Sequence, residues 1–589
     1  MTADETTEAA SLAALAAETW DRYLAAHPEF ATAIGDRRFD DRLRANGRGA
    51  LAAEAEQLDD DLRRAEAIDP ALLSSGDAVT RSALLDVLGY ERDLALAGID
   101  AWAVDPLDGP QVTFLNIPSF QPVRDRHEAE ALAARWAAMA GWVDRHVETS
   151  RDALAQGIGG PAALVRSVVA ELNDLLARPV AEWPLMDPAG NLPADLAPAD
   201  RDRLAAAIRS SVERDIRPAF ARYRAFLVDE LAPVARSDDQ PGMLGVPGGA
   251  DGYARVVRAH TTLELSPDEI HRIGLAETDR IDAEFADLGR EMFGTGDRRA
   301  VIARLRSDPD LHFRTGAEVR AVAEATLARA NAAIPKWFGR LPRADCVVVE
   351  IPEHEARHST IAYYREPAAD GSRPGSYYVN TTEPATRPRY EAEVLGFHEA
   401  VPGHHLQIAI AQELADLPAF RRYAGPTAFI EGWGLYTERL SAEMGLYSGP
   451  LDRFGVISFD AWRASRLVVD TGLHALGWSR DAAIAFMLDH TALAENNIVN
   501  EVDRYLALPG QALAYKLGQL EIRRLREDAR AALGDRFDIR AFHDVVLGQG
   551  AVGLGTLASI VDDWLRASDG SPDAGSPSGG RTAGRPGPA

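Results

Sequence analysis

Apolar residues recur with helical spacing over more than half of this chain. From residue 9 to about 341, alanine, leucine and other apolar side chains fall at positions i, i+3 and i+4 among arginines and acidic residues. This spacing gathers the apolar side chains on one face of a helix, which must then pack against another element. Helices are predicted for residues 11–26, 49–67, 80–96, 126–156, 160–176, 198–234, 266–293 and 316–338. The chain is therefore expected to be mainly α-helical.

The period changes between residues 345 and 382. Three short runs there, 346–351, 360–364 and 375–381, are rich in β-branched and aromatic residues. Such runs predict three short strands, which we expect to form one small sheet. Segment 105–123 contains four prolines, and it is expected to be an irregular loop between helices.

The composition divides the chain only near its ends. We expect a flexible N-terminus over residues 1–10 and a single helical domain over 11–566, which includes the sheet at about 345–382. Residues 567–589 are mostly Gly, Ser, Pro and Asp. Such a segment buries too little apolar area to offset its ordering entropy, so it is expected to be a disordered tail.

Charge and cysteine content narrow the possible partners. The chain has 63 Lys and Arg against 90 Asp and Glu, a formal net charge of −27. This argues against nucleic acid or an anionic membrane as a partner. The single cysteine, Cys346, excludes a disulfide within the chain. Residues 1–8 are acidic and polar and lack the pattern of a secretory signal, so we expect a cytoplasmic protein.

Three histidines and a glutamate lie together within residues 398–405. A zinc-hydrolase helix usually carries two histidines at i and i+4, with a glutamate after the first. Here His398 and Glu399 are followed by His404 and His405, at i+6 and i+7. Pro402 cannot donate a backbone hydrogen bond and clashes with the preceding turn, so the helix is expected to kink or bulge. The alternative is a set of core or helix-capping histidines.

A two-histidine site needs a third ligand. Glu431 follows within a second predicted helix that begins near Pro426 and folds back beside the first. Two histidines and one glutamate leave one coordination position for water, which is the catalytic zinc pattern. Glu399 would then be the general base. Glu438 lies two turns after Glu431 on the same face, and it is expected to support the ligands or to be a solvated carboxylate.

Either His404 or His405 could be the second imidazole ligand. The choice of His404 departs from the usual motif by two inserted residues, which one local bulge can absorb. The choice of His405 requires three inserted residues, or a reach of about two helical turns. We therefore predict His404 as the ligand, with His405 supporting the site or contacting substrate.

Several motifs together resemble a large bacterial family called domain of unknown function 885. The resemblance covers residues from about 15 to 566, and it is carried by segments 28–36, 260–262, 265–275, 398–407, 431–438 and 509–521. That family is in turn similar to the helical gluzincin peptidases, such as angiotensin-converting enzyme and the thermostable carboxypeptidases. Those enzymes have an uninterrupted HExxH motif and a downstream glutamate ligand. The resemblance implies a large helical metallopeptidase-like fold with a central cleft and a small β-sheet next to the active site.

The resemblance also implies roles for residues outside the metal ligands. In the similar peptidases a sheet walls the active-site cleft, and its edge strand binds the substrate backbone. Segment 377–381 is the candidate edge here, although a purely structural hairpin is an equal alternative. The candidate substrate-binding residues are Tyr377, Tyr378 and Asn380. Tyr515 matches the family motif for a residue that binds the oxyanion, and His474 is a second candidate.

These observations predict a zinc metallohydrolase with one Zn²⁺ per chain. His398, His404 and Glu431 would hold the metal, and Glu399 would activate water to cleave the amide bond of a short peptide or similar small substrate. One alternative is an amidohydrolase that tailors a specialised metabolite. Another is a non-catalytic peptide-binding protein on a peptidase scaffold, which the intact His398, Glu399 and Glu431 disfavour.

Overall fold

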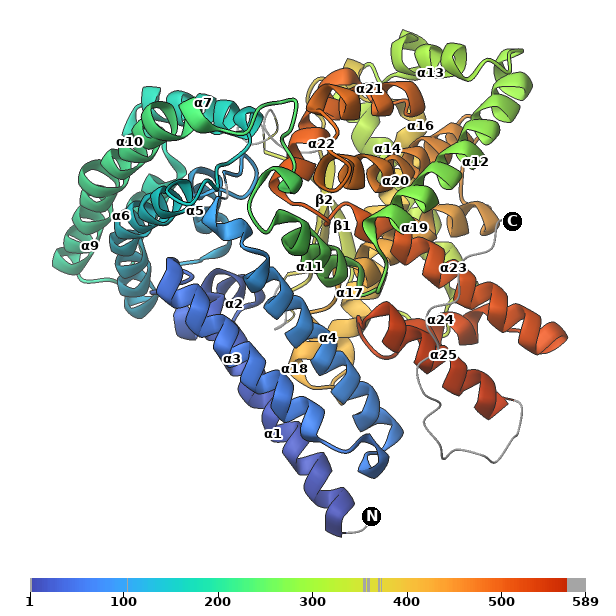
Figure 1. Cartoon of the computed structure of the whole chain (residues 1–589), viewed down its shortest axis with the longest axis horizontal. Helices are drawn as coiled ribbons and strands as arrows, with labels where there is room; N and C mark the ends of the chain where they lie inside the picture. The colour runs from blue at the N-terminus through green and yellow to red at the C-terminus, as the bar shows by residue number, and fades with distance from the viewer. Residues whose placement is uncertain are drawn as a thin grey trace.

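The structure is a computed structural model that describes residues 3–102, 104–352, 356, 361–368, 371 and 373–568. Helices dominate it, and one small sheet lies in its second half (Figure 1). The predicted fold class, mainly α-helical with a small sheet before the histidine-rich segment, is confirmed. Residues 569–589 lie outside the described part, so the disordered tail stays a prediction there.

The N-terminal helices pack as a layer along one side of the molecule. They are α1 (Ala3–Ala26), α2 (Pro28–Ile34), α3 (Arg48–Ala67) and α4 (Ser75–Ala97). α1 begins at Ala3, so most of the segment expected to be flexible is helical. The side chain of Ser74 caps α4 by accepting from the backbone N–H of Asp77 at 3.1 Å, and Gly98 ends it in the left-handed conformation.

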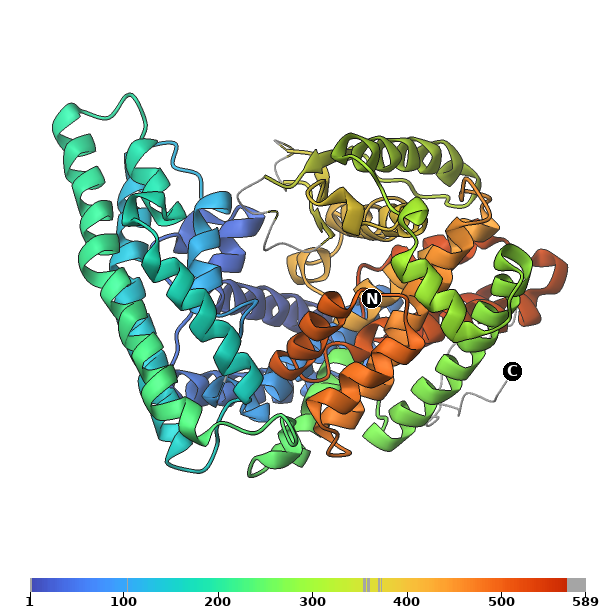
Figure 2. The ribbon, with the colours of Figure 1, turned by 90° about the horizontal axis from the view of Figure 1, so that it is seen from above.

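A second group of helices stands to one side of the remainder in both whole-chain views (Figures 1 and 2). It contains α5 (Pro110–Phe120), α6 (Arg126–Leu154), α7 (Ala162–Ala177), α8 (Asp187–Gly190), α9 (Pro198–Ser210) and α10 (Arg217–Phe226). Its apolar core continues into Leu473, Met487 and Tyr505 of later helices. Shared apolar burial therefore joins this group to the half that carries the histidines.

Residues 105–123 were expected to form a loop. This expectation is wrong for most of the segment, because α5 occupies Pro110–Phe120. Pro110 stands in the first turn, where a missing backbone N–H costs nothing. Pro118 lies inside the helix near its end. The buried side chains of Phe114 and Ile117 outweigh the lost hydrogen bond at Pro118.

The central helices carry the residues that position the site. They are α11 (Gly249–Thr261), α12 (Pro267–Phe293), α13 (Arg298–Ser307), α14 (Gly316–Ala333), α20 (Asp452–His474), α21 (Arg480–His490) and α22 (Glu495–Ala507). A capping box at Ser266 and Glu269 starts α12. α12 packs along α20, whose side chains are almost all buried. α20 is thus a central helix with little freedom to move.

The sheet contains β1 (Cys346–Glu350), β2 (Ala362–Arg365) and β3 (Gly375–Val379). The spatial order is β1-β3-β2, with β1 parallel and β2 antiparallel to β3. Segment 377–381 was expected to provide the free edge, and this is wrong because β3 is the central strand. Neighbouring strands use the backbone groups on both of its sides.

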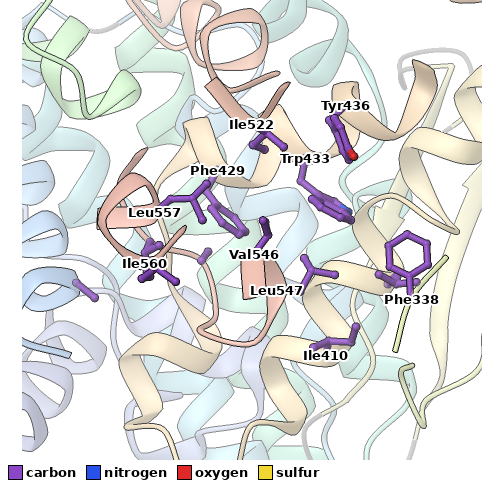
Figure 3. Close-up of a cluster of buried hydrophobic side chains, with 14 of the residues drawn as sticks. Phe338, Ile410, Phe429, Trp433, Tyr436, Ile522, Val546, Leu547, Leu557 and Ile560 are labelled. Atoms are coloured by element: carbon purple, nitrogen blue, oxygen red, sulfur yellow. The ribbon is translucent and has the colours of Figure 1, made fainter. Parts of the chain in front are cut away.

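The histidine segment lies between the sheet and a compact apolar core. It forms α16 (Arg389–Glu399), α17 (His404–Glu413), α18 (Ala419–Tyr423) and α19 (Thr427–Glu443). The last three helices of the described part are α23 (Leu513–Leu533), α24 (Ile539–Leu547) and α25 (Leu554–Ser568). Figure 3 shows Phe429 and Trp433 of α19 packed among side chains of α17, α23, α24 and α25. A Cβ on Gly432 would lie 2.5 Å from the backbone of Gly518, so α19 and α23 touch closely. This packing fixes the helix that carries Glu431.

Candidate metal centre

The two helices that carry the histidines are separated by a short non-helical break. α16 ends at Glu399 and α17 begins at His404. A Cβ on Gly403 would lie 1.9 Å from the carbonyl oxygen of His398, so glycine is required there. The indole N–H of Trp433 in α19 donates to the carbonyl oxygen of Pro402 at 3.0 Å. The break is therefore held against α19, and it brings His404 back towards His398.

His398, His404 and Glu431 converge on one point. The Nε2 atoms of His398 and His404 lie 3.6 and 3.4 Å from Oε2 of Glu431. The two imidazole rings are 4.7 Å apart and nearly perpendicular. Ligand atoms held by zinc at about 2.1 Å in a tetrahedron stand roughly 3.4 Å apart. The observed spacing therefore fits a zinc ion.

One buried polar atom at this point has no hydrogen-bond partner among the described residues. It is Oε2 of Glu431. Burial disfavours the Glu431 carboxylate, but the adjacent His404 and His398 hold its pKa well below the usual range. A buried carboxylate oxygen without a donor is costly. Its position between two imidazole nitrogens is explained if a cation binds there.

Glu438 fixes the orientation of His398. Its Oε1 lies 2.8 Å from Nδ1 of His398, which leaves Nε2 of that ring facing Glu431. A carboxylate behind a ligating imidazole is the usual supporting contact at zinc sites. Burial opposes the imidazolium of His398, but the adjacent carboxylates of Glu431 and Glu438 raise the pKa of His398 to about 9. The predicted supporting position of Glu438 matches this geometry.

His405 faces away from the metal point. Its Nδ1 lies 2.9 Å from the hydroxyl of Tyr364 in β2, and its Nε2 lies 3.0 Å from the carbonyl oxygen of Ala344. Both ring nitrogens are thus engaged with the segments around the sheet. Successive residues of α17 point in different directions, so His404 reaches Glu431 while His405 joins the helix to the sheet.

The triad opens into a large cavity of about 950 Å³. Glu399, Tyr377, Asn380 and Tyr515 also line this cavity. Glu399 is half-buried, and burial raises the pKa of its carboxyl above the usual value. The cavity therefore brings a carboxylate able to exchange protons next to the three candidate ligands.

The candidate substrate residues of β3 occupy different environments. Tyr377 is buried and lines the cavity, whereas Tyr378 stacks on Tyr363 with ring centres 4.7 Å apart and is not on the cavity wall. Asn380 donates to the carbonyl oxygen of Ala356 and accepts from Thr382, so its amide also supports the adjacent loop. The strand that offers an outer edge to the cavity is β2, because Ala362, Tyr363 and Tyr364 line it.

The two candidates for the oxyanion contact differ in position. Tyr515 lines the cavity and lies close enough to Glu431 for that carboxylate to raise its pKa, after the larger effect of burial. His474 does not line the cavity. Its Nδ1 accepts from the backbone N–H of Met243, and its Nε2 lies 3.0 Å from the carbonyl oxygen of Tyr505. The prediction for His474 is therefore wrong, because both ring nitrogens serve the backbone.

Two arginines on the cavity wall were not recognised in the sequence. Arg463 and Arg466 are buried on α20 and line the cavity near Tyr515. The available signal was the presence of two arginines, one turn apart, and it was weak because the same helix also carries Asp460 and Asp470. Arginines are seldom fully buried unless they are paired.

A second cluster of possible metal ligands lies elsewhere. His27, Glu54 and Glu91 also offer atoms within 4.8 Å of one another. Arg44 lies 3.6 Å from Glu54 and already supplies a positive charge there. The histidine-rich centre on α16, α17 and α19 is therefore the better metal site.

Comparisons with solved structures show the same overall fold in two bacterial proteins. A "putative lipoprotein" from Colwellia psychrerythraea is 28% identical, with a TM-score of 0.87 over 95% of this chain and 99% of that chain. A second putative lipoprotein of unknown function, from Shewanella oneidensis, is 16% identical and has a TM-score of 0.73. The match covers 93% of this chain and 99% of that chain. A Pyrococcus furiosus carboxypeptidase is 11% identical, and the match covers 96% of this chain and 99% of that chain. Its TM-score of 0.38 is too low to support a conclusion about this protein.

The two bacterial structures contradict the expected cytoplasmic location. Both of those proteins are described as putative lipoproteins. Among the described residues, no helix has the length and apolar character needed to cross a bilayer.

The family comparison agrees with the motifs. No curated protein matches the sequence. A model of bacterial proteins of unknown function matches residues 28–561, which is most of the chain. This protein therefore belongs to the DUF885 family.

Proposed function

We propose that this protein is a zinc-dependent hydrolase that cleaves an amide bond in a short peptide or a similar small substrate. The observation that carries the proposal is the convergence of His398, His404 and Glu431 on the wall of a large cavity, with Glu399 beside them. Two imidazoles and one carboxylate are typical ligands of a catalytic zinc, and they leave a position open for water or substrate.

Zinc fits the donor set, because the ligand atoms have tetrahedral spacing and Oε2 of Glu431 lacks any other partner among the described residues. When bound, zinc would polarise the substrate carbonyl and lower the pKa of a water towards about 7. Glu438 would hold His398 in the required tautomer through its contact with Nδ1.

Glu399 is the residue placed to move the proton. It removes a proton from water as the water oxygen bonds to the carbonyl carbon, and it returns that proton to nitrogen as the C–N bond breaks. Burial raises the pKa of Glu399, which helps it to hold the proton between these steps. Tyr515 is the candidate donor to the oxyanion, since its ring lies on the same cavity wall.

The sheet supports a peptide as the substrate. Among the described strands, β2 pairs with β3 alone, along one of its sides. Its residues Ala362, Tyr363 and Tyr364 line the cavity. An extended peptide could add to this edge through backbone hydrogen bonds, which would present a carbonyl group to the metal centre.

The test is a digest of a tripeptide library by three preparations: metal-stripped protein, the same protein with zinc restored, and zinc-treated His398→Ala. Cleavage products are measured by mass spectrometry, and zinc per chain by elemental analysis. We expect cleavage only in the zinc-restored wild type, which should hold about one zinc. Cleavage by the stripped protein or by His398→Ala at the level of the zinc-restored wild type would contradict the proposal.

A further inference from the structure

Two arginines are held in the cavity wall by aromatic stacking. Arg463 and Arg466 lie one turn apart on α20, and they are only 4% and 3% exposed. Both line the cavity that contains His398 and Glu399. Their guanidinium carbons lie 4.1 and 4.5 Å from the centre of the Trp462 ring. This stacking holds both cations in place, but aromatic faces do not accept the in-plane hydrogen bonds of a guanidinium.

The hydrogen-bond partners of these arginines are incomplete within the described part of the chain. Arg466 donates to Glu501 at 2.9 Å and to Tyr505 at 3.0 Å, yet its Nη1 is buried without an acceptor. Arg463 is less satisfied. Its Nε and Nη1 have no acceptor, and its Nη2 lies 3.9 Å from Oε1 of Glu438, beyond hydrogen-bond distance. Buried polar groups are almost always paired, so these free donors call for an acceptor.

Few carboxylates lie in direct contact with the guanidinium groups at this end of the cavity. Arg504 adds a third guanidinium, because it lies on the cavity wall and shares Glu501 with Arg466 at 3.0 Å. Among the described residues, Glu501 and Glu438 are the carboxylates within 4 Å of the three guanidinium groups, and Glu438 also serves His398. A further compact anion would complete the hydrogen bonding of these arginines.

We infer that the substrate carries a carboxylate next to the cleaved bond, and that Arg463, assisted by Arg466, binds this group. A carboxylate is planar and offers two acceptor oxygens, which match the fork of guanidinium donors. The position relative to the cleaved bond rests on the proposed function of the metal centre. Arg463 is thus a specificity-determining residue, because an uncharged peptide amide lacks the two carboxylate oxygens that its donors require.

The contacts also limit how far this carboxylate lies from the cleaved bond. From Nε2 of His398, the path to Arg463 crosses one imidazole ring, the 2.8 Å contact to Glu438 and the 3.9 Å contact to Arg463. This path is at most about 9 Å, which corresponds to no more than roughly three residues of extended chain. The free C-terminus of a short peptide has this placement, and so does an acidic side chain close to the cleaved bond.

The experiment uses one tripeptide library in three forms: free C-terminal acids, C-terminal amides, and amides that end in Asp or Glu. Zinc-loaded wild-type protein digests each form, and the kcat/KM values are compared. In parallel, zinc-loaded Glu399→Gln is equilibrated with the same library, and the retained peptides are identified by mass spectrometry. We expect free acids to exceed plain amides by about 10- to 100-fold in both readouts, the usual worth of hydrogen bonds between charged groups.

The variant Arg463→Met keeps an apolar stem against Trp462 and removes the charge. We expect the acid-to-amide ratio to fall close to one in Arg463→Met and to recover in part in Arg463→Lys. The ratio compares two peptides on the same preparation, so a general loss of metal or folded protein cancels. The control is Arg453→Met, on the same helix, where Arg453 pairs with Glu291 outside the cavity. This control should keep the wild-type ratio.

The outcomes separate the inference from the proposed function. Equal retention of acids and amides by Glu399→Gln, in which Arg463 and Arg466 are intact, or an unchanged ratio in Arg463→Met, overturns the inference. Preferential retention of acids without cleavage, lost in Arg463→Met, supports the anion site while the proposed hydrolysis fails. Equal preference for free acids and for amides that end in Asp or Glu supports the site and shows that it accepts either source of carboxylate.

Discussion

At the residue scale, a break in the helix explains how His398 and His404 come together although they are six residues apart. His404 and His405 are adjacent in sequence, but only His404 faces Glu431, at 3.4 Å. His405 instead contacts Tyr364 and Ala344. We predict that His404→Ala lowers bound zinc to less than about a tenth of a mole per chain, whereas His405→Ala keeps about one. Elemental analysis after dialysis measures this difference. Loss of zinc only in His405→Ala would show that the wrong ring is assigned.

A further prediction concerns the carboxylate behind His398. Glu438 lies 2.8 Å from Nδ1 of His398, so Glu438→Gln should weaken zinc binding by roughly 10- to 100-fold. Competition with a chromogenic chelator measures the affinity. Glu443→Gln is the matched control, because Glu443 lies further along α19 and pairs with Arg526. Equal affinities in the two variants would show that the Glu438 contact does not support the metal.

The sequence indicated some of these residues and could not indicate others. His398, Glu399 and Glu431 stand out because a histidine followed by glutamate, with a second glutamate on a later helix, matches the residue types of a catalytic zinc site. His474 was misassigned because its motif does not reveal that Met243 and Tyr505 engage both ring nitrogens. Arg463 was missed because its environment depends on Glu438 and Tyr515, which arrive from α19 and α23.

At the scale of elements, α19 approaches α16 so closely that glycine is needed at the contact. A Cβ on Gly434 would lie 2.8 Å from Cε1 and 2.9 Å from Nε2 of His398. Gly434→Ala should therefore displace the His398 ring and weaken zinc binding by at least about 10-fold, because ligand geometry sets affinity. Zinc titration measures the loss, and helical circular dichroism checks the fold.

The control for this substitution is Gly555→Ala in α25, where an added Cβ meets no atom within 4 Å. It should keep the wild-type affinity, since alanine is well tolerated in a helix. A Gly434→Ala protein with unchanged zinc affinity would mean that α19 and α16 can separate without harm to the site.

Most elements followed from their local pattern, and the exceptions have physical causes. The helical periods and the β-branched runs predicted the main helices and the three strands. The order of the strands was not predictable, because pairing between residues far apart in sequence leaves no local signal. α5 was taken for a loop because its prolines conceal how much Phe114 and Ile117 gain by burial.

At the scale of the whole molecule, the ligands come from three helices, so metal binding should stabilise the packing of α16, α17 and α19. A ligand that binds only the folded state at about 100 times its Kd adds roughly 2.7 kcal/mol. We predict that zinc raises the Tm of metal-stripped wild type by a few degrees and leaves Glu431→Ala unchanged. Differential scanning fluorimetry measures both. An equal rise in both proteins would place the stabilising ion elsewhere.

The location of the molecule was the least predictable property. The acidic and polar residues 1–8, which lack a secretory pattern, led to the expectation of a cytoplasmic protein. The description of the two similar structures as lipoproteins contradicts it.

The central claim is that Glu399 performs chemistry at a zinc centre without holding the metal. Its most direct test measures zinc content and peptide hydrolysis on the same preparations of wild type, Glu399→Gln and the control Glu413→Gln, whose residue contacts Arg343 outside the cavity. All three should hold about one zinc per chain. Turnover should fall by about 10²- to 10⁴-fold in Glu399→Gln alone, the usual worth of a positioned acid and base. Near-normal turnover in zinc-loaded Glu399→Gln would contradict the account.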